Sequence, residues 1–108
     1  MLQTSEIAQR FTTIRQTIHD AERASESASD SSPELRQYLH QLADEAKSAD
    51  AIISAGEQRR IVECIDRLED MGDEARRLSR SDEHMSPQLE SAVTKVHAEL
   101  SQLKHQLH

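Results

Sequence analysis

Histidine is the residue type in this chain with the widest range of available chemistry. The six histidines are His19, His40, His84, His97, His105 and His108. A metal site needs several ligands that converge at fixed spacing. His105 and His108 share one helical face but have no third ligand nearby, and no histidine has a glutamate three residues before it, as di-iron bundles require. The sequence therefore predicts no metal and no other cofactor.

The single cysteine, Cys64, lies on the edge of an apolar stripe. Arg60 and Arg67 lie within one turn of it, and Glu63 and Asp66 offset their charge. A thiol in that setting is expected to be a small residue at the core edge, not a nucleophile. Because the spacing also indicates no Ser/His/Asp or Cys/His arrangement, we expect a protein that is not an enzyme.

A run of acids could bind a cation or a basic partner, and arginines lie at i+3 and i+4 from several of its members. The run consists of Glu63, Asp66, Glu69, Asp70, Asp73 and Glu74. We expect a solvated face with pairs inside the helix to Arg67, Arg76 and Arg77.

His40 begins a short motif, His40-Gln41-Leu42. It is similar to the start of the His-x-Leu-Lys-Gly motif of histidine phosphotransfer domains, which are four-helix bundles of about this length with an exposed histidine on the second helix. The resemblance implies an alternative function, a signalling bundle that uses His40. Ala43 and Asp44 stand where the family has lysine and glycine. Asp44 shares a helical face with His40 and would repel a phosphoryl group.

The elements that must position these residues repeat at half the length of the chain. Ser32-Pro33-Glu34-Leu35 recurs 54 residues later as Ser86-Pro87-Gln88-Leu89. The same offset superposes apolar positions, for example Ile7 on Ile61, Phe11 on Ile65, Leu39 on Val93 and Leu42 on Val96. We expect one domain, residues 1–108, built from two helical hairpins, 1–54 and 55–108.

The helix-capping and helix-breaking residues of the chain predict four helices. The first is expected to begin near Thr4 or Ser5, and the second and fourth at the Ser-Pro pairs, where serine caps and proline takes the first turn. Gly56 is expected to end the second helix, the alternative being one long helix through it. The third is expected to end between residues 79 and 85.

Apolar residues at coiled-coil-like 4-3 spacing indicate that the helices share one core. The predicted fold is therefore all-α, an antiparallel up-down-up-down four-helix bundle. The alternatives are a dimer of hairpins and a domain-swapped dimer, so the chain is expected to be a monomer or a homodimer.

Gly72 is unusual because a glycine inside a helix costs about 1 kcal/mol relative to alanine. It occupies the core position that Ile18 fills 54 residues earlier. We expect it to permit close approach of another helix. The alternative is a groove or cavity that accepts a partner's side chain or a small ligand.

The net charge of −7 argues against binding to nucleic acid or to an anionic membrane. The N-terminal residues lack the pattern of a signal peptide, so a cytoplasmic protein is expected.

With no catalytic constellation, the predicted function is protein–protein contact, as an adaptor, chaperone or regulator. The alternatives are phosphotransfer through His40 and binding of a small ligand or metal. Five residues beside the core stripes are expected to form an exposed apolar patch: Leu2, Ala8, Tyr38, Ile52 and Val62.

Overall fold

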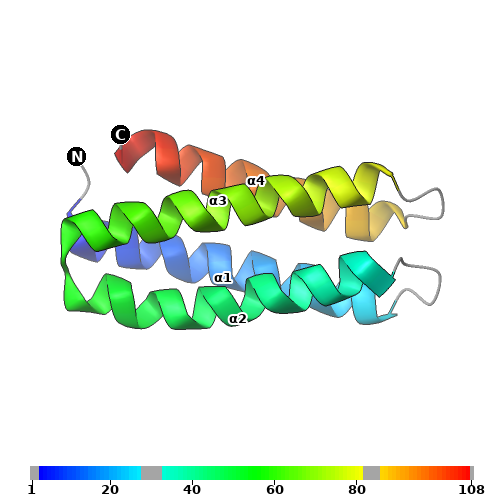
Figure 1. Ribbon diagram of the computed structural model, residues 1–108, viewed down its shortest axis with the longest axis horizontal. Coiled ribbons are helices and arrows are strands. Elements are labelled where there is room, and N and C mark those ends of the chain that lie inside the picture. Colours follow the sequence, from blue (N-terminus) through cyan, green and yellow to red (C-terminus); the bar gives the residue numbers. More distant parts are fainter. Residues whose placement is uncertain (1–2, 28–32, 82–85, 108) are drawn as a thin grey trace.

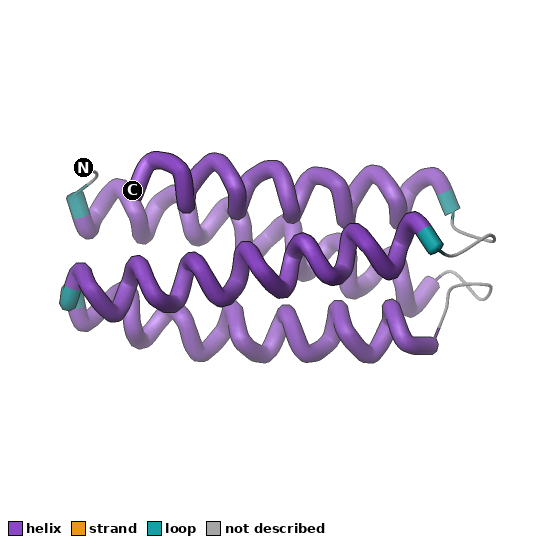
Figure 2. The backbone as a smooth tube through the Cα atoms, turned by 45° about the horizontal axis from the view of Figure 1, so that its top comes forward, coloured by secondary structure: helices purple, strands orange, loops and turns teal. Residues whose placement is uncertain are grey.

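The computed structural model describes residues 3–27, 33–81 and 86–107. Its regular elements in these ranges are α1 (Thr4–Ser27), α2 (Pro33–Ala55), α3 (Gln58–Arg80) and α4 (Pro87–Leu107). Figure 1 shows consecutive helices running in opposite directions, and each helix packs against two others in the cyclic order α1, α2, α3, α4. The tube view shows the helices lying side by side along the long axis of the bundle (Figure 2). The predicted all-α four-helix bundle is confirmed.

The helices end where the local chemistry favours it. Gly56 has φ of 76°, a left-handed conformation that suits glycine, and its amide donates to the carbonyl of Ile53 at 3.1 Å. The chain therefore turns between α2 and α3, and one long helix through Gly56 is excluded. At the start of α4, the Ser86 hydroxyl accepts a hydrogen bond from the Leu89 amide at 3.1 Å. Ser32, the expected cap of α2, lies outside the described residues.

The buried positions of the two hairpins correspond at a constant offset. Each buried residue of α3 lies 54 positions after a buried residue of α1, and each buried residue of α4 lies 54 positions after one of α2. Thr17 and Ala43 are buried in the first hairpin alone. Positions related by this offset therefore have matching environments in the two hairpins.

The hairpins fill this shared space with opposite choices of side-chain size. In the second hairpin Gly72 is buried, and a Cβ added there would lie 3.2 Å from Leu100 Cδ1 and 3.7 Å from His97 Cα. The offset relates this pair to Ile18 and Ala46, which line one groove between α1 and α2. Large thus packs against small in both hairpins, as dense packing requires.

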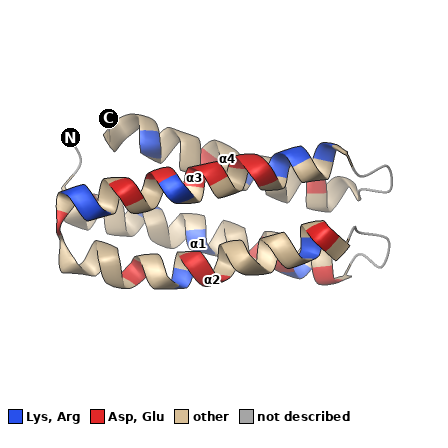
Figure 3. Ribbon diagram, viewed as in Figure 1, with Lys and Arg blue, Asp and Glu red and all other residues tan. Residues whose placement is uncertain are grey.

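The outside of the bundle is strongly polar. Figure 3 shows basic and acidic residues interspersed along all four helices. Within the described ranges, no helix is long and apolar enough to span a bilayer.

Candidate functional site: the α2–α3 seam

We call the strip of surface along which two neighbouring helices meet a seam. At the α1–α2 seam Arg15 bonds to Asp50, and at the α4–α1 seam Thr17 Oγ1 donates to Glu99 Oε1 at 2.7 Å. At the α3–α4 seam Lys104 Nζ lies 3.6 Å from Glu69 Oε2. A polar contact therefore spans each of these three seams, as Arg67–Glu45 spans the α2–α3 seam.

The α2–α3 seam is lined differently. Six half-buried residues line it at seven-residue intervals: Tyr38, Glu45 and Ile52 on α2, and Cys64, Met71 and Leu78 on α3. Positions seven apart lie close together on one face of a helix. All except Glu45 are apolar or weakly polar and pack against the core. We call Tyr38, Ile52, Cys64, Met71 and Leu78 the seam row.

Three members of the row are placed at this seam by their surroundings. Met71 lines a groove together with Glu45 and other residues of α2. Burial, and then the carboxylates of Glu74 and Asp70 on α3, raise the pKa of Tyr38. Burial, and then the Glu45 carboxylate on α2, raise the pKa of the Cys64 thiol, which opposes a nucleophilic role. Ile52 and Leu78 follow from the heptad spacing.

The α4–α1 seam supplies an internal comparison. The 54-residue offset relates the six lining positions to Ala92, Glu99, Gln106, Arg10, Thr17 and Ala24. There, Thr17 bonds to Glu99 and Arg10 bonds to Gln106, and the remaining two positions are alanines. The sixth position is a glutamate at both seams, Glu99 and Glu45, and Glu45 pairs with Arg67. The other five positions carry polar or small residues at the α4–α1 seam and the apolar seam row at the α2–α3 seam. The row is therefore not required by the architecture alone.

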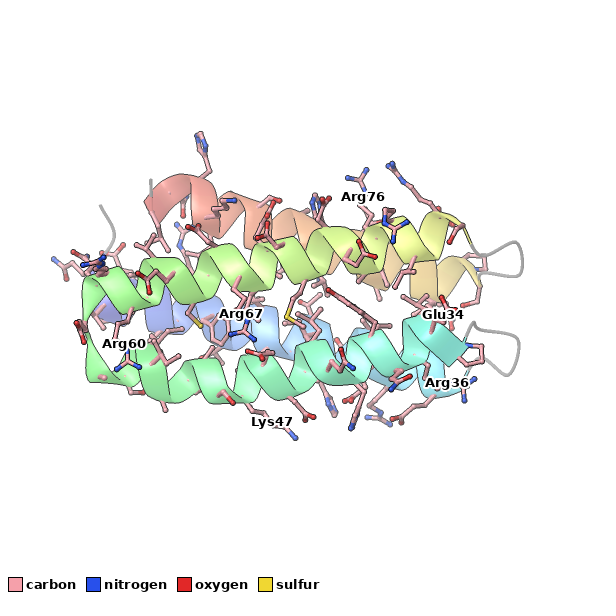
Figure 4. All side chains as sticks on the ribbon, in the orientation of Figure 1. Glu34, Arg36, Lys47, Arg60, Arg67 and Arg76 are labelled. Carbon is pink, nitrogen blue, oxygen red and sulfur yellow. The ribbon has the colours of Figure 1, made fainter. Side chains whose placement is uncertain are left out.

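The groove at the α2–α3 seam has a volume of about 340 Å³ and is lined by Gln41, Asp44, Glu45, Ser48, Arg67 and Met71. Arg67, labelled in Figure 4, lies between the two helices, and its Nη2 donates to Glu45 Oε1 at 3.0 Å. Grooves of similar or larger volume lie at the other seams. Volume does not distinguish the α2–α3 seam, and its groove is lined mainly by polar side chains. What distinguishes the seam is the apolar seam row, which packs against the core beside that groove.

His40, the histidine of the phosphotransfer-like motif, is exposed on α2 in an acidic setting. Its Nδ1 lies 2.6 Å from Glu22 Oε2 of α1, and its Nε2 lies 3.9 Å from Asp44 Oδ2. The hydrogen bond to Glu22, followed by the charge of Asp44, raises the pKa of His40. Carboxylates that favour the protonated imidazole also repel a phosphoryl donor, so this environment favours an ion pair over phosphotransfer.

The other histidines have different environments. His97 is unexpectedly shielded: its side chain is 18 % exposed, and its Nε2 lies 3.2 Å from Asp73 Oδ1. His19 lies 3.9 Å from Glu22 on the exposed side of α1, and His105 is exposed. His84 and His108 lie outside the described residues.

The sequence missed the His97 pair because the pair depends on the register between α3 and α4. The only available signal was the position of His97, which directly follows the core residue Val96.

Gly72, the second predicted site residue, lies in the interior against Leu100 and His97. This geometry favours close approach of α4 over a groove open to a partner. His40 and Gly72 lie on different helices and at different seams, so the structure does not bring them into one site.

The predicted apolar patch does not form as one surface. Tyr38 and Ile52 face the α2–α3 seam, whereas Val62 lies four and seven residues before Asp66 and Glu69, on the side of α3 that faces α4. Ala8 is exposed on α1, and Leu2 lies outside the described residues. The sequence did not predict that Cys64, Met71 and Leu78 share a seam with Tyr38. Which residues at the edges of two apolar stripes lie together depends on the register between the helices.

The acidic run of α3 is also paired differently from expectation. Arg77 pairs with Glu74 inside the helix, as predicted. Arg67, however, reaches Glu45 on α2, and Glu69 and Asp73 contact α4. These carboxylates lie on the sides of α3 that face its neighbours, which brings cross-helix partners within reach.

Among the described residues, no group of three or more histidine, cysteine, aspartate or glutamate side chains is arranged to hold a metal ion. Comparisons with protein-family models, with curated proteins and with solved structures found no match to this chain.

Proposed function

We propose that this chain is a non-enzymatic helical bundle that binds another protein through its α2–α3 seam. The observation that carries the proposal is the contrast between two seams at matching positions, one closed by polar pairs and one lined by an apolar row. An apolar row costs solubility, and the related seam is built without one. Contact with a partner explains its presence.

The residue types of the row support this role. Tyrosine and methionine are enriched in the centres of protein interfaces, because each offers a large contact area with adaptable geometry. Tyr38 is the only tyrosine of the chain, and it lies in this row. The acidic surroundings of His40 weaken the phosphotransfer alternative, and the enclosed position of Gly72 weakens the small-ligand alternative.

The test is affinity capture of the tagged chain from its source cells with matched variants. Tyr38→Ala and Met71→Thr introduce the residues that stand at the related positions of the α4–α1 seam, so the fold is expected to tolerate the pair. Thr13→Ala with Gln102→Ala changes two exposed residues of that other seam and is the control.

A partner captured by the parent chain and the control, but lost with the Tyr38/Met71 variant, supports the proposal. Equal capture by both variants, or no partner above background with the parent chain, contradicts it. Circular dichroism of each variant checks that the helices are intact.

A further inference from the structure

We propose that the occupant of the α2–α3 seam is an amphipathic helix of a partner protein with basic residues flanking its apolar stripe. This inference rests on the proposed function and names the chemistry of the partner. It follows from the shape of the seam, from the spacing of its row and from its charge balance.

The shape and the spacing favour a helix. Figure 1 shows α2 and α3 side by side along nearly the whole length of the bundle. The row offers an apolar contact at seven-residue intervals along α3, from Cys64 to Leu78, and at Tyr38 and Ile52, fourteen residues apart, on α2. A third helix laid between α2 and α3 would present apolar residues at the matching i, i+3, i+4 and i+7 spacing.

The charge around the Tyr38 half of the seam is negative. Asp44 and Glu45 line the groove, and Asp70 and Glu74 act on the Tyr38 hydroxyl. Two guanidinium groups, those of Arg67 and Arg77, already pair with Glu45 and Glu74. The residues named here thus place four carboxylates and two guanidinium groups around the Tyr38 half of the seam.

Counted by the residues that line the hollows alone, the α2–α3 groove has two carboxylates, Asp44 and Glu45, against Arg67, whereas the α4–α1 seam is balanced. The charged residues lining its two hollows are Arg10, Lys95, Asp20 and Glu99, two of each sign. The excess of negative charge therefore coincides with the apolar row. Complementary charge speeds association and selects partners, so a stripe flanked by lysine or arginine fits this seam better than an acidic one. The same excess disfavours an anionic membrane surface.

The experiment uses the full chain and two synthetic helical peptides of about eighteen residues with the same leucine stripe. One peptide carries lysine at the flanking positions and the other glutamate, and each carries a fluorescent label for anisotropy. The expected result is binding of the lysine peptide at least about tenfold tighter than the glutamate peptide, weakening as salt is raised. NMR shifts should centre on the Tyr38 ring and the Met71 methyl group. Tyr38→Ala/Met71→Thr should weaken binding about tenfold, and Thr13→Ala/Gln102→Ala should not.

Equal binding of the two peptides, preference for the glutamate peptide, or shifts centred on another seam would overturn the inference. Absence of binding by both peptides at millimolar concentration would overturn it as well. So would sedimentation equilibrium showing that a second copy of this chain covers the seam, as a dimer lost with Tyr38→Ala/Met71→Thr. The capture experiment decides the proposed function separately, because it measures dependence on the seam whatever the chemistry of the partner.

Discussion

At the scale of single residues, the environment of a side chain decides its chemistry more than its type does. His40 begins a phosphotransfer-like motif, yet it faces carboxylates on both helices of its hairpin. Glu22 and Glu26 lie on α1, Asp44 lies on α2, and His19 contacts the far side of Glu22. A protonated imidazole is stabilised there.

We therefore expect the NMR titration of His40 to give a pKa above its ordinary value of 6.5. A histidine whose pKa is raised on folding contributes stability below pH 6.5, and this contribution is lost as pH rises through the folded pKa. Glu22→Gln should lower the pKa of His40. A value at or below the ordinary one in the parent chain would contradict the ion pair.

Tyr38 provides a second test at this scale, because the chain has one tyrosine and no tryptophan. Burial and the nearby carboxylates should hold its pKa above 10.0, and Glu74→Gln should lower it. The stability contributed by the neutral phenol is present below pH 10.0 and lost as pH rises through the folded pKa. Ultraviolet absorbance of the phenolate measures this directly. Ionisation at the ordinary value would place Tyr38 in open solvent.

At the scale of helices, the Ser-Pro pair at residues 86–87 sets the start of α4. Ser86→Ala should lower the free energy of unfolding by about 1 kcal/mol, because the Leu89 amide loses its acceptor. Ser91→Ala, on the exposed surface of the same helix, is the control and should cause no loss. Urea denaturation measures both variants, and equal stabilities would show that the cap contributes nothing.

The two hairpins place the large side chain on opposite helices at one pair of core positions: Leu100 packs against Gly72 in the second hairpin, and Ile18 takes the place of Gly72 beside Ala46 in the first. Gly72→Ile alone should destabilise by about 1–3 kcal/mol through overpacking against Leu100. Leu100→Ala alone should cost about 2–5 kcal/mol. The double variant copies the Ile18–Ala46 arrangement, so its loss should be smaller than the sum of the single losses by about 1–2 kcal/mol. Additive losses in a double-mutant cycle would contradict the matching environments.

Helix positions were predictable because each depends on local chemistry. The stop at Gly56 and the starts near Thr4 and at Pro87 follow from caps and turn residues a few positions away. The site was much less predictable. Pairs such as His40 with Glu22 and Arg67 with Glu45 join different helices, and their register depends on how the cores interlock. The spacing of the apolar residues shows which face of each helix is buried, but not which residues of neighbouring helices lie opposite one another.

At the scale of the whole molecule, positions related by the 54-residue offset carry different residue types at the α4–α1 and α2–α3 seams. Its α4–α1 seam is closed by Thr17–Glu99 and Arg10–Gln106, and its α2–α3 seam carries Tyr38 and Met71 beside an excess of carboxylates. Because the residues of the seam row pack against the core but are only half-buried, the bundle can present their exposed parts to a partner while its buried core stays intact. The central claim is therefore one of location: binding occurs at one seam and not at the seam that matches it.

Site-specific photocrosslinking in the source cells tests this claim most directly. A crosslinking amino acid is placed at Ser48, which is exposed in the α2–α3 groove, or at Gln102, its counterpart 54 residues later in the α4–α1 seam. We expect crosslinks to a second protein from position 48 and not from position 102, lost when Tyr38→Ala and Met71→Thr are added. Equal crosslinking from both positions, or none from position 48, would contradict the assignment of the α2–α3 seam as the binding surface.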